Sequence, residues 1–175
     1  MNPFISFSVF FTILVIFISP ATSQKPGTGL YENVCNGVHE KQRCLKLAEN
    51  NPELTSAKDY LTLSRSFLKM SIEKSTKGQN YLKNLVNKYP SSKALKECST
   101  NCYNACVGDF KGSLEELTED PLSASYDAFV AGDEPNRCDK LLADEKIVND
   151  PSISTLNNEM KFLSFLANEI ITHLQ

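Results

Sequence analysis

Glycine, proline and histidine are scarce in this sequence, and hardly any stretch alternates β-branched residues with polar ones. There are 7 glycines, 8 prolines and 2 histidines among 175 residues. Half-buried strands show strict alternation of apolar and polar residues, so the shortage of that pattern argues against a β fold. The chain also lacks a glycine-rich phosphate loop, an internal repeat and a low-complexity segment. These absences favour an all-α fold.

The shortage of histidine also bears on catalysis. Nucleophilic catalysis needs a Cys or Ser beside a histidine base that a third group holds in place. His39 and His173 are far apart and each is alone in its segment. Both are predicted to face solvent, and His173 is expected near a helix C-terminus, where a cation is favourable. We therefore expect no enzyme, no cofactor and no metal site.

Neither sign of charge forms a run in the sequence. Eighteen basic and twenty-one acidic residues leave a net charge of -3. Nucleic-acid binding requires a concentrated basic face that neutralises phosphates. Nucleic acid is therefore not an expected partner.

The first 23 residues carry no charged side chain, and residues 4–18 are nearly all apolar. Such a stretch, followed by small residues up to Ser23, is typical of a secretory signal peptide. It is shorter than the roughly 20 residues that a membrane-spanning helix needs. A retained anchor stays as the alternative, because no Lys or Arg precedes the apolar run. We predict a signal peptide at 1–23 and a single domain at 24–175, with no membrane contact after cleavage.

All six cysteines lie beyond this apolar stretch. They are Cys35, Cys44, Cys98, Cys102, Cys106 and Cys138. In a chain bound for an oxidising compartment, disulfides are the default expectation. Six cysteines allow 15 pairings, so their number does not determine the connectivity.

Four long helical stretches are expected in the predicted domain. The last begins at Thr155, a plausible N-cap, and its apolar residues follow spacings of four and three. They are Leu156, Met160, Leu163, Ala167, Ile170 and Leu174. Another stretch begins near Ser92, although Gly108 and Gly112 weaken the prediction that it is continuous.

The remaining two stretches precede and follow the one that begins near Ser92. Ser56 is a possible cap for a helix that Gly78 interrupts and that resumes until Pro90 stops it. Between residues 123 and 145 the helical pattern is broken at Pro135. Its apolar positions are Tyr126, Phe129, Val130, Cys138, Leu141 and Leu142.

Residues 30–49 contain two apolar groups that are too short to form stable helices alone. A bridge between Cys35 and Cys44 would join them into a hairpin. Four longer helices plus this hairpin predict an up-and-down four-helix bundle, because short loops make sequential helices antiparallel neighbours.

The cysteine spacing and helix order resemble those of the plant inhibitors of invertase and pectin methylesterase. The resemblance rests on Cys35 and Cys44 with eight residues between them, on Cys98 and Cys138 about 40 residues apart, and on residues 94–98, which read Ala-Leu-Lys-Glu-Cys. An amphipathic C-terminal helix completes it. The resemblance implies a four-helix bundle with an N-terminal disulfide-stapled helical hairpin. It also implies disulfides from Cys35 to Cys44 and from Cys98 to Cys138.

Cys102 and Cys106 depart from the family pattern. Tyr is common in the family where Cys102 stands, Ala105 is retained, and Cys106 is an addition. Two structural interpretations remain open. Both residues are buried thiols that replace a core Tyr and Val, or they form a disulfide with each other. The geometry of a regular helix would strain such a disulfide. An exposed thiol used for dimerisation is a third reading. Oligomeric state is left undetermined.

The resemblance implies an inhibitor in the cell wall or apoplast, or in the vacuole, that blocks the active-site cleft of pectin methylesterase or of acid invertase. Invertase inhibitors of the family insert a loop carrying Pro-Lys-Phe. The corresponding turn here reads Pro121, Leu122, Ser123. It has neither the cation nor the aromatic ring, which favours pectin methylesterase over invertase. A function of another class, an extracellular carrier of apolar ligands, is less favoured, because lipid-transfer proteins carry eight cysteines with adjacent Cys-Cys and Cys-x-Cys signatures.

Overall fold

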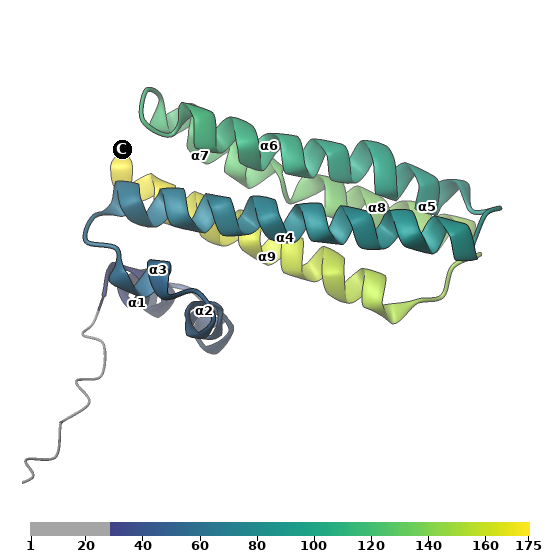
Figure 1. Cartoon of the computed structure of the whole chain (residues 1–175), viewed down its shortest axis with the longest axis horizontal. Coiled ribbons are helices and arrows are strands. Elements are labelled where there is room, and N and C mark those ends of the chain that lie inside the picture. Colours follow the sequence, from purple (N-terminus) through teal and green to yellow (C-terminus); the bar gives the residue numbers. More distant parts are fainter. Residues whose placement is uncertain (1–28) are drawn as a thin grey trace, which may run out of the picture.

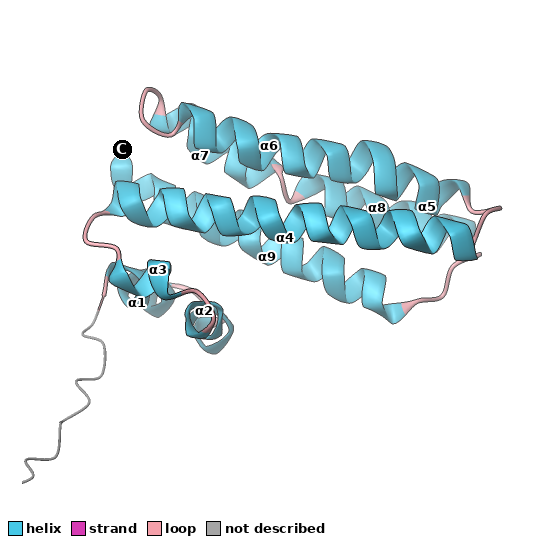
Figure 2. Ribbon diagram, viewed as in Figure 1, coloured by secondary structure: helices cyan, strands magenta, loops and turns pink. Residues whose placement is uncertain are grey.

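The computed structural model describes residues 29–175, which form helices joined by short connections and contain no strand (Figures 1 and 2). The bundle helices are α4 Tyr60–Lys88, α5 Lys93–Glu97, α6 Tyr103–Glu116, α7 Pro121–Val130, α8 Asp133–Glu145 and α9 Pro151–Ile171. A π-helical turn, Cys98–Cys102, joins α5 to α6, and a 3-10 turn, Thr172–Leu174, follows α9. The predicted all-α four-helix bundle is confirmed, with α5 to α6 and α7 to α8 each forming one arm. The predicted signal peptide lies outside the described residues.

The first bundle arm, α4, is one continuous helix that begins later than expected. Its N-cap is Asp59, whose Oδ1 accepts a 2.7 Å hydrogen bond from the Thr62 amide. Ser56 instead ends the short helix α3, Pro52–Ser56, so the predicted cap was wrong. Gly78 does not interrupt α4. The hydrogen bonds of a helix join backbone groups, which glycine also has.

Gly78 marks a close approach of three helices. A Cβ built there would lie 2.9 Å from Leu156 Cδ1 on α9 and 3.0 Å from Tyr103 Cε1 on α6. A side chain there would therefore force Leu156 or the buried Tyr103 ring to shift. Gly78, which was predicted to interrupt the helix, therefore serves the packing of the three helices.

The second arm begins as predicted, with Ser92 Oγ accepting a 3.0 Å hydrogen bond from the Leu95 amide. Gly108 and Gly112 lie inside α6 without breaking it. In the third arm the break comes at residues 131–132, not at Pro135. Pro135 lies in the first turn of α8, where its missing N–H has no helical partner to lose.

The C-terminal helix α9 begins five residues earlier than predicted. Asp150 is the N-cap, and its Oδ1 accepts a 3.1 Å hydrogen bond from the Ser152 amide. Pro151 takes the first helical position, which suits its restricted φ. Of the six predicted seam residues, four are buried and Leu156 and Leu174 are partly exposed. None of the helices between residues 29 and 175 combines the length and hydropathy that a membrane crossing would need.

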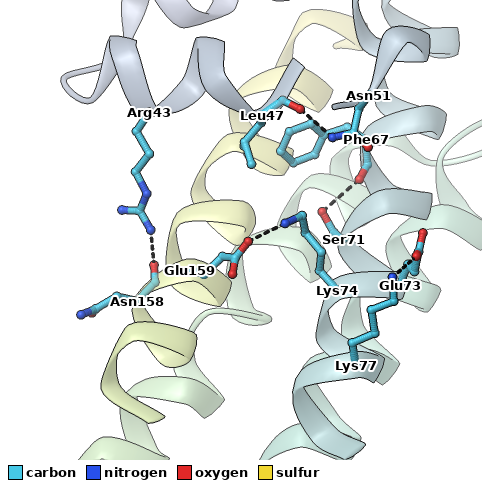
Figure 3. Close-up of polar contacts among 10 residues, drawn as sticks. All are labelled: Arg43, Leu47, Asn51, Phe67, Ser71, Glu73, Lys74, Lys77, Asn158 and Glu159. Atoms are coloured by element: carbon cyan, nitrogen blue, oxygen red, sulfur yellow. Dashed lines mark hydrogen bonds and ion pairs between the residues drawn. The ribbon is translucent and has the colours of Figure 1, made fainter. Parts of the chain in front are cut away.

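The N-terminal hairpin consists of α1, Leu30–Gly37, and α2, Lys41–Glu49, followed by α3. Tyr31 joins the two hairpin helices and packs on the bundle. Its hydroxyl donates a 2.8 Å hydrogen bond to the Cys44 carbonyl, and its ring centroid lies 6.3 Å from that of Phe67 on α4. On α2, Arg43 donates a 2.9 Å hydrogen bond to the Asn158 carbonyl of α9 (Figure 3). The hairpin therefore packs on the bundle through both α4 and α9.

Candidate interaction surface

Four of the six cysteines form two disulfides in the structure. Cys35 and Cys44 join α1 to the start of α2, with Cα atoms 5.5 Å apart. Cys98 and Cys138 join the π-helical turn to α8, with Cα atoms 5.0 Å apart. Both bridges are fully buried. They support the fold rather than a reactive centre.

Cys102 and Cys106 are free thiols and both are fully buried. They form no local bridge, and neither has the exposure that an intermolecular bridge requires. Burial raises the pKa of the Cys102 thiol to about 11 and moves that of Cys106 higher still. Because the thiolate is the nucleophile, both side chains are unreactive in the native state.

The two histidines lie apart, as the sequence suggested. His39 is exposed between α1 and α2, whereas the His173 ring stacks on Tyr60 with centroids 4.1 Å apart. Across residues 29–175, no group of three His, Cys, Asp or Glu side chains is arranged to hold a metal ion.

The tripeptide Pro121, Leu122, Ser123 does not form the turn that was expected. It is the first turn of α7, because Asp120 caps the helix: its carboxylate accepts hydrogen bonds from the Ser123 amide at 3.1 Å and hydroxyl at 2.8 Å. The turn lies just before it, at residues 117–119. The side chain of Leu122 is 68% exposed.

Leu122 begins a row of exposed apolar side chains on α7. Tyr126 and Phe129 follow at spacings of four and three, which places all three on one helix face. Their exposed fractions are 68%, 65% and 55%, while Ala124 and Ala128 on the other face are fully buried. We call Leu122, Tyr126 and Phe129 the α7 stripe. Single exposed apolar residues are ordinary, but a contiguous row indicates an interaction site.

The helical pattern predicted from the sequence includes Tyr126 and Phe129 but does not say which face of the helix they occupy. Alanines fill the core side of α7, so the helix lies close to its neighbours and the large side chains point outward. One signal in the sequence could have revealed the exposed face. The large apolar residues of this helix lie on one face and the alanines lie on the opposite face. Periodicity alone does not say which face is buried.

Acidic residues surround the α7 stripe. Residues 112–136 contain seven Asp and Glu and no Lys, Arg or His. Exposed Glu115, Glu116 and Glu119 lie before the Leu122 end, and exposed Asp133 lies beyond the Phe129 end. By contrast, α4 carries six basic residues and one acidic residue. The small net charge of the whole chain conceals this separation of acidic and basic residues. Counting the charged residues of each helix reveals it.

Asp109 on α6 shows the effect of this acidic region. Burial raises the pKa of its carboxyl to about 6, and the nearby carboxylates of Asp127, Glu134 and Asp133 add to the shift. Asp127 packs closely against α6, since a Cβ at Gly112 would lie 2.6 Å from its Oδ2. The neighbouring carboxylates therefore reinforce an upward shift whose main cause is burial.

The fold matches that of solved pectin methylesterase inhibitors. Mutant form A of a pectin methylesterase inhibitor from Arabidopsis superposes with a TM-score of 0.68 at 16% sequence identity, over 82% of this chain and 96% of that one. A pectin methylesterase inhibitor from Arabidopsis thaliana gives a TM-score of 0.58 at 21% identity, over 83% and 95%. No protein-family model and no curated protein matches the sequence. The fold implied by the cysteine spacing is thus confirmed at low sequence identity.

Proposed function

We propose that this chain is a secreted inhibitor of pectin methylesterase that covers the enzyme's substrate cleft without forming a covalent bond. The observation that carries the proposal is the shared fold, which extends over more than four fifths of the chain and nearly all of each inhibitor structure. The predicted signal peptide supports secretion to the cell wall, with the vacuole as the other destination.

We place the main contact with the enzyme at the α7 stripe. Burial of apolar side chains contributes about 25 cal/mol per Å² of area removed from water, and large aromatic residues dominate the affinity of interfaces. The acidic residues at both ends of the stripe favour an enzyme surface with basic residues around an apolar centre. An anionic membrane surface would be repelled by the same carboxylates.

Acid invertase is the second candidate target, but one observation weighs against it. Leu122 and Ser123 supply neither charge nor a ring at the start of α7. A carrier of apolar ligands has less support still. It would need an apolar cavity, whereas three cavities among the described residues are open grooves lined in part by charged side chains.

Titration of purified pectin methylesterase and acid invertase with the oxidised secreted protein at mildly acidic pH tests the proposal. We expect methylesterase activity to fall at micromolar inhibitor or below and invertase activity to persist. Absence of methylesterase inhibition in this range would contradict the proposed function. Inhibition of invertase alone would establish the second candidate.

The contact surface is tested by the double variant Leu122→Ser, Tyr126→Ser. Both side chains are more than 60% exposed, so the fold should keep its stability while the inhibition constant rises about tenfold or more. Ile147→Ser is the matched control, because Ile147 is 47% exposed in the connection between α8 and α9. If the double variant inhibits as well as the native protein, the stripe is not the contact, although the inhibitor function would stand.

A further inference from the structure

A second surface feature lies between the hairpin and the bundle, away from α7. It is an open groove of about 560 Å³ between α2, α4 and α9. Four cations line it: Arg43, Lys46, Lys74 and Lys77. Two carboxylates, Glu73 and Glu159, also line it. Its cations therefore outnumber its carboxylates by two to one.

Both carboxylates are already engaged by lysines of the groove. Lys74 Nζ lies 2.6 Å from Glu159 Oε1, joining α4 to α9, and Lys77 pairs with Glu73 one turn earlier on α4 (Figure 3). Within residues 29–175, Lys46 forms no ion pair. The groove thus keeps positive charge that its own acids do not neutralise.

Arg43 is held in place at one side of the groove. Its guanidinium lies 4.0 Å from the ring centroid of Phe162 and donates a 2.9 Å hydrogen bond to the Asn158 carbonyl. It also forms an ion pair with Glu40, 3.0 Å away on the hairpin. A guanidinium positioned in this way loses little conformational entropy when it binds an anion.

The rest of the lining is a mixture of apolar side chains and amides. Leu47, Met70 and Phe162 provide apolar surface, and Asn50 and Asn51 provide amides. A simple anion such as phosphate would use only the cations. A molecule with carboxylates, hydroxyls and apolar C–H faces would use all three kinds of lining.

We propose that this groove binds an acidic oligosaccharide, in particular a stretch of galacturonate units. The volume lies in the range of sites for small ligands, and the open shape admits a segment of a longer polymer. Each sugar would place a carboxylate on a cation and a ring face on the apolar lining. The choice of galacturonate among acidic sugars rests on the proposed function, because removal of methyl esters from pectin exposes these carboxylates.

This site recognises the product of the methylesterase rather than its substrate. Methyl-esterified galacturonate has no charge and would leave Lys46, which has no ion pair among the described residues, without an anionic partner. The inhibitor would therefore be retained where the enzyme has already acted. The α7 stripe, on another helix, would remain available to the enzyme.

The test is calorimetric titration of the secreted, oxidised protein with a short galacturonate oligomer at mildly acidic pH and low salt. The fully methyl-esterified oligomer and polyglutamate are the comparison ligands. We expect saturable binding of the free-acid oligomer that weakens as salt rises. The methyl-esterified oligomer should not bind, and polyglutamate should bind at least about tenfold more weakly.

The variant Lys46→Gln, Lys77→Gln removes two exposed cations of the groove and should weaken galacturonate binding about tenfold or more. The matched control is Lys83→Gln, Lys88→Gln, which removes two exposed cations of α4 outside the groove and should change binding by less than about twofold. Inhibition of the methylesterase on a short soluble substrate should be unaffected by either variant.

Several results would overturn the proposal. Lack of galacturonate binding, equal binding of the methyl-esterified oligomer, or equal losses in the two double variants would each do so. Equal affinity for polyglutamate would show that the groove attracts any polyanion and does not recognise the sugar. If galacturonate binds as expected while no methylesterase is inhibited, the groove stands and the proposed function fails.

Discussion

Tyr103 and Asn157 are both fully buried, and the tyrosine hydroxyl donates a 2.8 Å hydrogen bond to the amide oxygen of the asparagine. The asparagine Nδ2 donates in turn to Asp139 Oδ1 at 2.6 Å, and Lys161 Nζ lies 3.0 Å from Asp139 Oδ2. Burial raises the pKa of Tyr103 far above its ordinary value, so the hydroxyl stays protonated and keeps donating. This chain of contacts ties α6, α9 and α8 together.

Asn157→Ala is expected to lower the free energy of unfolding by about 2–3 kcal/mol, because it leaves a buried hydroxyl without an acceptor. Chemical denaturation measures the change. The neighbouring Asn158→Ala is the control: its side chain is exposed and the expected change is within about 0.5 kcal/mol. Equal losses in the two variants would show that the buried hydrogen bond contributes nothing specific.

Gly78→Ala and Gly108→Ala should have opposite effects, although both glycines lie inside helices. A methyl group at position 78 would meet Leu156 and Tyr103 at 2.9 and 3.0 Å, whereas nothing lies within 4 Å of one at position 108. We expect Gly108→Ala to raise stability by about 0.5–1 kcal/mol. Gly78→Ala should lower it by about 1 kcal/mol, since crowding outweighs the same gain in helix propensity. Thermal unfolding of both variants decides, and stabilisation by Gly78→Ala would contradict the close packing.

The two disulfides should contribute unequally to stability. On the chain-entropy model, the bridge from Cys98 to Cys138 closes the longer loop and is worth about 4 kcal/mol, against about 2.7 kcal/mol for the bridge from Cys35 to Cys44. Replacement of each pair by alanine should therefore lower the melting temperature more for the first pair. An unshifted melting temperature for Cys98→Ala, Cys138→Ala would contradict a stabilising role for that bridge.

Cys102 and Cys106 should resist alkylation while the protein is folded. Their raised pKa values and complete burial leave almost no accessible thiolate at pH 8. Mass spectrometry after treatment with iodoacetamide should find no added group in native buffer and two in denaturant without reductant. Modification of the folded protein would show that α6 opens locally or that the thiols are exposed.

Asp109 should make the protein more stable in mild acid than at neutral pH. Its pKa is about 6 in the folded state and about 4 in an unfolded chain. Between these values the folded state binds more protons, so its contribution to stability decreases as the pH rises through this window. Asp109→Asn should raise the free energy of unfolding by about 1 kcal/mol at pH 7, a figure reduced for the partial exposure of the side chain.

The same substitution should have little effect at pH 4, where the carboxyl of the native protein is largely protonated. Thermal unfolding at both pH values measures the difference. Glu116→Gln is the control, because Glu116 is exposed at the end of α6. Equal stabilisation by Asp109→Asn at both pH values would show that charge burial is not the cause.

Local signals in the sequence predicted the helices well and their ends less well. The predicted start near Ser92 is confirmed, because Ser92 is the N-cap of α5 and a helical pattern follows it at once. The predicted caps Ser56 and Thr155 were displaced by Asp59 and Asp150. Several capping residues stand close together at these sites, and the one used depends on where neighbouring helices hold the chain.

The candidate sites were much harder to predict. The stripe on α7 was not recognised because a helical period does not reveal which face meets the rest of the protein. The basic groove joins Arg43 and Lys46 of the hairpin to Lys74 and Lys77 of the bundle, and no local pattern links them. Sites assembled from distant segments appear only once the helices are packed.

The sequence by itself determined the all-α class, the order of the helices and the spacing of the cysteines, because these follow from composition and short-range periodicity. Tertiary structure alone decided that Gly78 packs inside a continuous helix and that Cys102 and Cys106 are buried thiols. It also decided that Leu122, Tyr126 and Phe129 face outward. Burial is a property of the whole assembly: a residue's exposure depends on which neighbours cover it, and those neighbours are distant in the chain.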